Sequence, residues 1–408
     1  MISAASASTA VEGLNAYSAD HPLILLTDYP PDAAGGGAVI LRDLLGPSER
    51  DKIVWVSPSR ASSRRDSEPG PSNEVRLRAG SEGRGGKRSI GLDSTLWAGA
   101  LAREVQRIAD DRQALAFWIV AHGSAVAIAA RLTRRHALPV HLTVHDDPAF
   151  ANALRSKRYL ALVPWIERDF ASAMRRASSI DVIGEAMALR YRKRYGVEPV
   201  VVHRGLEDGS ILPSRIYEGR ALRVGILGST YSYEQLPVLG RAVEAASKRL
   251  GIPGEIVVMG KSYGERLKAE MAGKIGVDVT GHVDEASAVA LLRDCFLLYL
   301  NYPFGRRDAV LRQTSFPTKL STYIQASRPL LLHMPPDSSV MPIVGPDGYA
   351  HPWGTSNASD GAAVLVDLWQ DPTNHASRHV QAESVRLRYF DRSKNRRTLF
   401  QTLDALVP

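Results

Sequence analysis

Short apolar runs alternate with longer amphipathic stretches along the first half of this chain. Runs of this length, bounded by turn residues, are typical of buried strands, and the stretches between them have helical spacing. The predicted strands cover residues 21–27, 52–57, 116–120, 140–144 and 180–183, and the predicted helices cover 38–45, 94–110, 125–135 and 186–195. Strands that alternate with helices form a parallel sheet covered on both faces, so this half belongs to the α/β class. Most of the Ser-, Gly- and Arg-rich stretch 58–91 is predicted to be an exposed, mobile loop.

The same alternation starts again after residues 204–220, which we interpret as a linker. The second set of predicted strands covers residues 222–227, 255–259, 277–280, 296–300 and 329–333, with a helix at 318–326 before the last of them. A chain of 408 residues is long enough for two cores. The sequence therefore predicts two doubly wound domains, at 21–203 and 221–385. Residues 1–20 are predicted to be a disordered tail, and 386–408 a helix that can cross back to the first domain.

The charge and the cysteine content limit the classes of partner. A formal net charge of +8 suits anionic partners such as nucleotides or phospholipid headgroups. The basic residues are dispersed and no zinc finger or KH loop is present, so nucleic acid is not an expected partner. The single cysteine, Cys295, lies in an apolar run, where a buried and unreactive thiol is expected. Without a secretory signal or a membrane-spanning stretch, we expect a cytoplasmic protein whose contact with the anionic inner face of a membrane is peripheral.

Two loops of the first half follow predicted strands and have residue types suited to a polar ligand. Gly36 and Gly37 lie between a strand and a helix, where glycines let backbone amides approach an anion. His145 and Asp146 follow the strand 140–144, a position from which they can contact a sugar hydroxyl or a leaving group. A tight turn and a polar loop are the alternatives for these two sites. No second cluster of ligands accompanies the carboxylate, so a metal site is not expected.

Two loops of the second half offer positive charge to a phosphate. Lys261 follows the predicted strand 255–259, but the glycine spacing around it does not fit a P-loop, and an ATPase is rejected. Thr318 can cap the helix 318–326, so that its free amides and Lys319 would face a diphosphate. A solvated loop lysine and an ordinary capped helix are the alternatives.

Taken in order, these loops resemble those of the GT-B glycosyltransferases, in particular the group that includes bacterial mannosyltransferases and glycogen synthases. The resemblance covers nearly the whole chain from about residue 21 onward. In the first half it rests on the glycine-rich loop, on the strand end Thr143-Val-His145-Asp146 and on Tyr195-Gly196. In the second half it rests on four segments, Gly225-Ile-Leu-Gly228, Val257-Val-Met-Gly260, Val279-Thr-Gly281-His282-Val283 and the stretch from Phe316-Pro-Thr-Lys319 to Pro329.

This resemblance implies a GT-B fold, with two Rossmann-like domains facing across a cleft, and a retaining transfer of sugar from a nucleoside-diphosphate sugar. It assigns His145 and Asp146 to catalysis. It assigns donor binding to Gly36, Gly37, Ser229, Lys261, His282, Val283, Ser315, Pro317, Thr318, Lys319 and Thr322. Because protein cations would stabilise the leaving diphosphate, no metal or other cofactor is expected besides the sugar-nucleotide co-substrate. The implied acceptor is a saccharide or a lipid-linked saccharide in bacterial surface polysaccharide assembly.

Several positions depart from the pattern of that family. Many members have two glutamates before and within the donor helix, and here Thr314 and Thr322 occupy those positions. A threonine cannot form the charge-assisted pair that a carboxylate forms with ribose hydroxyls. Ser229 stands among residues where the family has Arg and Lys, and Ser327 stands where a glycine is expected.

These departures leave the function open to three interpretations. Donor binding is either rearranged, with Lys261 and Lys319 supplying the charge, or weakened. A weakened site would fit a catalytically silent GT-B-like protein that serves in complex assembly or regulation. A sugar-nucleotide epimerase of the same fold ranks last, because no extra carboxylate cluster lies near the donor loops.

Overall fold

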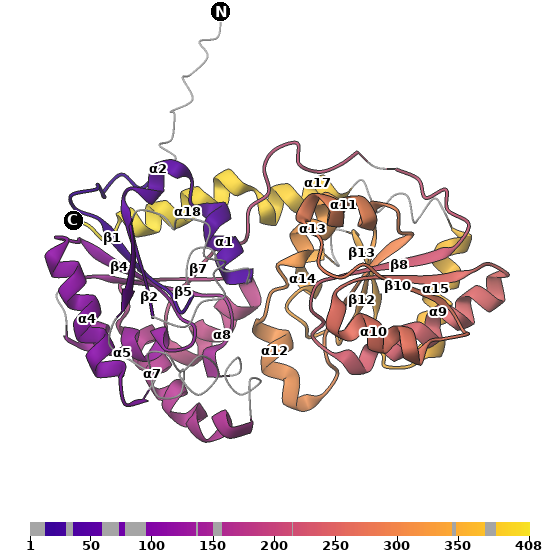
Figure 1. The fold of residues 1–408 in the computed structure, drawn as a ribbon, viewed down its shortest axis with the longest axis horizontal. Coiled ribbons are helices and arrows are strands. Elements are labelled where there is room, and N and C mark those ends of the chain that lie inside the picture. The colour runs from indigo at the N-terminus through magenta and orange to yellow at the C-terminus, as the bar shows by residue number, and fades with distance from the viewer. Residues whose placement is uncertain are drawn as a thin grey trace, which may run out of the picture. The chain divides into compact units, whose positions relative to one another are not determined.

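The computed structural model divides the chain into two compact units, each built around one parallel sheet (Figure 1). It describes residues 13–29, 36–58, 73–77, 95–135, 138–149, 157–213, 215–344, 348–371 and 381–408. The first unit comprises the described residues up to Gly205 together with Arg392–Pro408, and the second unit comprises Leu206–Asp391. The segment predicted as a linker therefore belongs largely to the second unit, where the amide of Leu212 donates to the carbonyl of Gln325 at 3.0 Å.

The first unit contains a seven-stranded, all-parallel sheet in the order β3-β2-β1-β4-β5-β6-β7. Its strands are β1 (Leu23–Leu26), β2 (Ile53–Pro58), β3 (Glu74–Leu77), β4 (Ala116–Val120), β5 (Val140–Val144), β6 (Ser179–Val182) and β7 (Val200–Val201). All residues of the central strands β1, β4 and β5 are buried, as their continuous apolar runs predict.

Helices cover both faces of this sheet, as the doubly wound pattern requires (Figure 1). They are α1 (Gly36–Leu44), α2 (Pro47–Arg50), α4 (Ala98–Asp111), α5 (Ala125–Arg135), the 3-10 helix η1 (Lys157–Leu162), α7 (Val163–Arg176), α8 (Glu185–Tyr195) and α18 (Arg392–Asp404). Helix α8 ends at Gly196, whose left-handed backbone (φ +68°) stops the helix. Helices α4, α5 and α7 pack side by side, and α18 contacts α1 and β6.

Two parts of the first unit differ from the prediction. Residues 13–20 are not a tail, because Leu14 and Tyr17 are buried and the Tyr17 hydroxyl donates to the Leu403 carbonyl at 2.7 Å. Residues 1–12 lie outside the described part of the chain. The predicted loop 58–91 contains β3, which ends in the buried Leu77, and the rest of that loop beyond Pro58 and residues 73–77 is not described.

The second unit contains a six-stranded, all-parallel sheet in the order β10-β9-β8-β11-β12-β13. Its strands are β8 (Leu222–Leu227), β9 (Gly254–Met259), β10 (Gly276–Val279), β11 (Leu297–Asn301), β12 (Leu330–His333) and β13 (Ala350–Trp353). All but β13 follow the predicted runs. The sequence does not reveal β13 because Pro352 interrupts it, and the strand is tolerated at the edge of the sheet, where one side needs no partner.

The helices of the second unit pack on both faces of its sheet. They are the 3-10 helix η2 (Tyr233–Gln235), α9 (Leu236–Leu250), α10 (Lys261–Glu270), α11 (Glu285–Arg293), the 3-10 helix η3 (Arg306–Asp308), α12 (Ala309–Thr314), α13 (Lys319–Gln325), α14 (Met341–Val344), α15 (Ala358–Gln370), α17 (Gln381–Val385) and the π-helical turn η4 (Arg386–Phe390). Helices α9 and α15 pack against each other over an aliphatic core from β8, β9 and β11. Cys295 is fully buried, which confirms the expected burial, and burial raises the pKa of its thiol to about 12, which disfavours the reactive thiolate.

The C-terminal segment is not the single helix predicted for 386–408. The backbone is extended at Asp391 (φ −63°, ψ 113°), which separates η4 in the second unit from α18 in the first. Arg386 is buried and forms ion pairs with Glu383 and Asp208, so the turn before the break is fixed to the second unit. Among the described helices, none is both long and apolar enough to cross a membrane.

Candidate functional site

A polar corner lies beyond the carboxyl ends of β1 and β4 in the first unit. Asp28 accepts hydrogen bonds on Oδ1 from the backbone amide (3.2 Å) and hydroxyl (2.8 Å) of Ser124, and its Oδ2 lies 3.6 Å from Nδ1 of His122. Gly123 makes this contact possible. Its φ is +55°, and a Cβ there would lie 2.1 Å from Asp28 Oδ2, so both the backbone and the space require glycine.

Three residues converge beside this corner, and two of them are predicted site residues. A Cβ on Gly37 would lie 2.7 Å from the Tyr29 hydroxyl and 3.3 Å from Nδ1 of His145. The structure therefore brings together a residue of α1 and the loop after β5. Gly36 begins α1, and Asp146 is exposed beside His145. The buried Tyr29 hydroxyl has no hydrogen-bond partner among the described residues.

The protonation of this corner follows from its burial. Burial lowers the pKa of His145, while the carboxylates of Asp181 and Asp146 oppose that change and His122 adds to it. Burial, together with Asp28 and Asp146, raises the pKa of Tyr29 well above its usual value. The corner thus presents a neutral imidazole, which can accept a proton or a hydrogen bond, next to a phenol that can donate one.

A buried chain of hydrogen bonds crosses the sheet below His145, and we call it the polar ladder. It comprises Trp118, Thr143, Asp181, His141 and Ser179. Trp118 Nε1 donates to Thr143 Oγ1 at 2.7 Å, and the Thr143 hydroxyl donates to Asp181 Oδ1. His141 lies 2.6 Å from the same carboxylate oxygen through Nε2 and 2.8 Å from Ser179 Oγ through Nδ1. The polar ladder supports the strand end that carries His145, and no sequence pattern predicts it.

In the second unit, Lys319 reaches the loop after β8. Its ammonium donates to the carbonyl of Ser229, and no described carboxylate forms an ion pair with it. Burial lowers the pKa of Lys319 to about 7. The preceding Gly228 has a left-handed backbone (φ +65°), and its carbonyl accepts from the hydroxyl of Tyr263. The predicted residues Ser229 and Lys319 thus meet, and they place a half-buried cation without a described counter-ion at the carboxyl end of β8.

One turn along α13, Thr322 is hydrogen-bonded to a carboxylate that the sequence analysis missed. The Thr322 hydroxyl donates to Glu285 Oε1 at 3.1 Å. Glu285 is the first residue of α11 and directly follows the loop with the predicted residues His282 and Val283, of which His282 is exposed and Val283 half-buried. The position predicted to lack a carboxylate therefore has one beside it, supplied by another helix.

The start of α13 differs from the predicted capped helix. Thr318 has helical backbone angles (φ −54°, ψ −30°), and its side chain makes no capping hydrogen bond. The amides of Leu320 and Ser321 donate to the carbonyls of Pro317 (2.9 Å) and Thr318 (3.3 Å), so these two amides are not free for a diphosphate. The predicted cap is wrong because Thr318 already belongs to a tight first turn. Lys319, rather than the helix start, supplies the positive charge here.

Buried hydrogen bonds fix the segment that precedes α13. Ser315 is buried, and its carbonyl accepts from the hydroxyls of Tyr302 (2.7 Å) and Ser339 (2.5 Å). Thr314, at the other predicted glutamate position, donates its hydroxyl to the Val310 carbonyl of its own helix at 2.6 Å. It is therefore engaged in α12.

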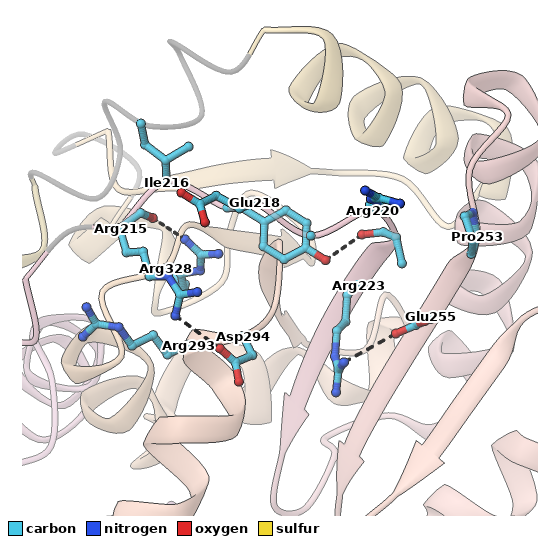
Figure 2. Close-up of a pocket in the computed structure, with 13 residues that line it drawn as sticks. Arg215, Ile216, Glu218, Arg220, Arg223, Pro253, Glu255, Arg293, Asp294 and Arg328 are labelled. Carbon is cyan, nitrogen blue, oxygen red and sulfur yellow. Dashed lines mark hydrogen bonds and ion pairs between the residues drawn. The ribbon is translucent and has the colours of Figure 1, made fainter.

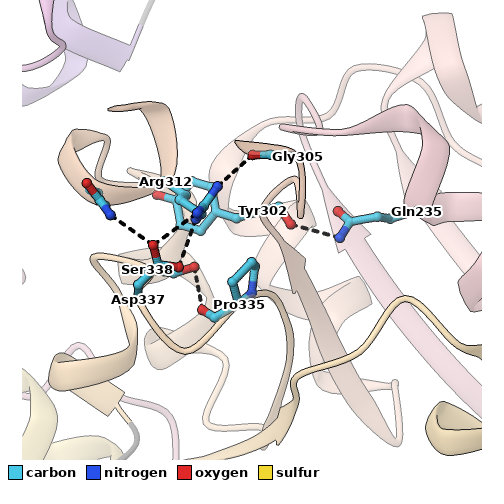
Figure 3. Close-up of polar contacts among 8 residues, drawn as sticks. Gln235, Tyr302, Gly305, Arg312, Pro335, Asp337 and Ser338 are labelled. Atoms are coloured by element: carbon cyan, nitrogen blue, oxygen red, sulfur yellow. Dashed lines mark hydrogen bonds and ion pairs between the residues drawn. The ribbon is translucent and has the colours of Figure 1, made fainter. Parts of the chain in front are cut away.

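A bidentate ion pair fixes the neighbouring loops (Figure 3). Arg312 donates from Nε and Nη2 to the two carboxylate oxygens of Asp337 at 2.8 and 3.0 Å, and from Nη1 to the carbonyl of Gly305 at 2.7 Å. Gln235 donates to the Tyr302 carbonyl at 2.7 Å. These contacts hold the segments after β11 and β12 in place beneath the Ser315 turn.

The remaining predicted residue, Lys261, begins α10 directly after β9, and its side chain lies outside what the structure describes. Within the described residues, no group of three or more histidine, cysteine, aspartate or glutamate side chains is arranged to hold a metal ion.

Comparisons with known proteins identify the fold. The chain matches no family model, and no curated protein matches it. Among solved structures, HepE from Anabaena in complex with UDP is 15% identical with a TM-score of 0.64, and the match covers 94% of this chain and 100% of that one. Sucrose-phosphate synthase from Thermosynechococcus elongatus is 13% identical with a TM-score of 0.67, covering 95% and 99%.

A third similar structure is a UDP-forming α,α-trehalose-phosphate synthase from Burkholderia vietnamiensis, at 13% identity and a TM-score of 0.61, covering 94% of this chain and 97% of that one. These matches run across both units, and they agree with two parallel sheets flanked by helices. The chain therefore has the GT-B glycosyltransferase fold, with two Rossmann-like domains.

Proposed function

We propose that this protein is a glycosyltransferase that moves a sugar from a nucleoside-diphosphate sugar to an acceptor hydroxyl. The observation that carries the proposal is Lys319, a half-buried cation without a described counter-ion, at the carboxyl end of a strand in a GT-B fold. Ligands of doubly wound sheets bind at that end of the strands. UDP is the first nucleotide to test, because the similar HepE has been solved with UDP and with UDP-glucose.

The chemistry assigned to Lys319 is stabilisation of the departing diphosphate. Negative charge develops on that group as the glycosidic bond to the donor breaks, and a fixed ammonium nearby lowers the barrier. An anion bound there would also neutralise the lysine, for which no described residue provides a counter-ion. This role for a protein cation supports a transfer that needs no metal, with Gly36, Gly37 and Lys261 as further donor contacts.

Glu285 supplies the carboxylate that Thr322 does not. In the resembling family a glutamate at the position of Thr322 binds the donor ribose. Here Glu285 Oε1 lies 3.1 Å from the Thr322 hydroxyl, and Glu285 is connected directly to the loop of His282 and Val283. We therefore assign ribose binding to Glu285 and Thr322 together.

In the first unit, we assign His145 to contacts with the sugar hydroxyl groups. Its lowered pKa leaves the imidazole neutral at neutral pH, and the Tyr29 hydroxyl beside it is a hydrogen-bond donor without a described partner. Such a pair can bind the hydroxyl groups of a sugar in one orientation. Asp146 is exposed at the same loop and is the second catalytic candidate.

The proposal also covers the stereochemistry of the transfer, the acceptor and the location of the protein. We propose retention of the anomeric configuration and a saccharide or lipid-linked acceptor in surface polysaccharide assembly, by analogy with the resembling group. We also propose that the protein is cytoplasmic, and its net charge of +8 supports peripheral contact with an anionic membrane surface.

The test combines binding and transfer. UDP and GDP are compared by thermal shift, since a nucleotide that binds the folded chain raises its unfolding temperature by mass action. Transfer of radiolabelled sugar from a panel of nucleotide sugars is then measured for the wild type, for His145→Ala and for the matched surface variant His21→Ala. We expect roughly 100-fold slower transfer for the first variant and wild-type transfer for the second. Failure of every nucleotide to bind would refute the proposal.

A catalytically silent GT-B-like protein is the second candidate. It is favoured by Thr314, whose hydroxyl is engaged within α12, so that no carboxylate side chain occupies that position. Nucleotide binding without transfer to any acceptor would support it over the enzyme.

A further inference from the structure

A second pocket lies at the opposite, amino end of the sheet in the second unit (Figure 2). It has a volume of about 620 Å³ and is lined by residues at or just before the starts of β8, β9, β11 and β12. Arg223 lies near the beginning of β8, whereas Ser229 and the proposed donor site lie beyond its end. The length of β8 therefore separates this pocket from the proposed donor site.

The lining of this pocket has an excess of positive charge. Five arginines line it, against three carboxylates, which leaves two positive charges uncompensated. Two of the carboxylates already face arginines at long distances, Glu255 at 3.6 Å from Arg223 and Asp294 at 3.5 Å from Arg215. Distances near the limit for an ion pair leave much of the hydrogen-bonding capacity of both guanidinium groups unused.

Arg328 is a buried arginine in the lining of this pocket. Its side chain is 1% exposed, and it donates to the carbonyls of Cys295 (2.7 Å) and Arg215 (2.5 Å) while lying over the ring of Tyr217. No carboxylate of a described residue forms an ion pair with it. Burial lowers the pKa of Arg328 to about 10, and the neighbouring Arg215 and Arg293 act in the same direction. A buried guanidinium without a counter-ion is costly to fold, so an anion that neutralises it stabilises the unit.

Two further arginines of the pocket are incompletely paired. Arg223 faces Glu255 at 3.6 Å and lies near the thiol of Cys295, and no described carboxylate lies within hydrogen-bond distance of its guanidinium. Arg220 is exposed, and nothing in the described part of the chain forms an ion pair or a hydrogen bond with it. Both line the same pocket as Arg328. Guanidinium groups present forked pairs of N–H donors, which match the oxygens of a phosphate.

We propose that this pocket is a second anion site that binds a phosphate monoester of sugar-phosphate size. The two excess positive charges match a dianionic phosphate, and the volume lies within the range of small-molecule sites. Tyr217, Ile216 and Pro253 offer apolar surface to the organic part of the ligand. The phosphate group comes either from a soluble sugar phosphate or from a lipid headgroup, and both present the same chemistry to the arginines.

The test uses the full chain and isothermal titration calorimetry at constant ionic strength. Glucose 6-phosphate is the probe and glucose is the uncharged control, each titrated with and without UDP. The variants are Arg220→Glu, Arg223→Gln and Arg241→Glu, of which the last changes an exposed arginine of α9 that does not line the pocket. We expect binding of glucose 6-phosphate but not of glucose. We expect roughly tenfold weaker binding or more in the first two variants, and no change in the third.

Unfolding temperatures of all variants establish that they are folded. A parallel flotation experiment with phosphatidylcholine vesicles, with and without phosphatidic acid, distinguishes the two sources of phosphate. Binding to either source that is lost in Arg220→Glu supports the proposal. Absence of binding to both sources, or an equal loss in Arg241→Glu, overturns it. We expect the pocket variants to bind UDP like the wild type, so failure of this site is distinguishable from failure of the proposed donor site.

Discussion

Each of the two sheets contains a buried histidine, and the two histidines differ in their hydrogen-bond partners. In the first unit, His141 lies in the polar ladder between the carboxylate of Asp181 and the hydroxyl of Ser179. In the second unit, His333 lies 2.6 Å from the Tyr299 hydroxyl and 2.8 Å from the Thr355 carbonyl, and it stacks on Trp353 at 3.6 Å, with no carboxylate of a described residue in contact. Both residues are fully buried on their strands.

The two units also differ in where their charged side chains lie. Burial lowers the pKa of His333 to about 4, so this histidine is neutral at neutral pH. Lys319 and Arg328, two cations without an ion pair to a described carboxylate, lie at opposite ends of the second sheet. The first sheet instead has a carboxylate in its interior, and Asp181 acts on the protonation of His145 above it. This contrast fits the proposed roles, in which the first unit orients hydroxyl groups and the second binds anions.

The largest expected effect comes from removing the carboxylate of the polar ladder. Asp181→Ala leaves His141 and Thr143 without their shared acceptor inside the sheet. We expect a loss of about 3 kcal/mol in the free energy of unfolding, because buried partners of a deleted charge stay unsatisfied. Urea denaturation measures the change. The matched variant Asp278→Ala, on the exposed part of β10, should change it by less than about 0.5 kcal/mol. Equal losses in the two variants would show that the ladder is not a special support.

Lys319→Ala tests the charge at the end of the second sheet. We expect UDP to bind roughly 10- to 100-fold more weakly, the usual cost of losing a hydrogen bond to a charged group. Because burial lowers the pKa of Lys319 to about 7, its charged form disappears as the pH rises through that value, and wild-type affinity for UDP should fall with it. Lys268→Ala, exposed on α10, is the matched control. An affinity that is independent of pH, or equally reduced in both variants, would argue against the assignment.

The fold was accessible from the sequence because it depends on local patterns. The apolar runs of the central strands identify β1, β4, β5 and β8 almost to the residue. Residues 13–20 were misjudged because two isolated apolar residues, Leu14 and Tyr17, give no periodicity, and only α18 shows what they pack against.

The candidate sites were less accessible, because they depend on contacts between distant segments. A glutamate in the first turn of a helix, such as Glu285, is expected there simply as a partner of the helix dipole. Its contact with Thr322 arises only when α11 packs on α13. Likewise, an arginine before a proline gives no sign that Arg328 is buried without an ion pair to a described carboxylate.

The pairing of Glu285 with Thr322 can be tested by moving the carboxylate from position 285 to position 322. Glu285→Gln should weaken UDP binding roughly tenfold, since it removes a charged acceptor for the ribose hydroxyls. Thr322→Glu alone places a second carboxylate beside Glu285, and we expect repulsion to weaken binding as well. The double variant Glu285→Gln, Thr322→Glu should restore it. Calorimetric titration of UDP measures all three. Stronger binding in the single variant Thr322→Glu would show that Glu285 does not serve this role.

The smallest expected effect concerns the residue that precedes Arg328. Ser327 is buried with φ +53°, a left-handed backbone that favours glycine, and among described non-glycine residues only Gln113 shares a positive φ. The strain is local to the turn between α13 and β12. We expect Ser327→Gly to stabilise the chain by about 0.5 kcal/mol, because relief of the strain exceeds the added backbone entropy of the unfolded state.

Ser327→Ala separates backbone strain from the loss of the hydroxyl. Alanine keeps the strain and lacks the hydroxyl, so it should be less stable than both serine and glycine in urea denaturation. If alanine were instead as stable as glycine, the left-handed backbone would not be strained. The second unit would then keep Arg328 in its pocket at no conformational cost.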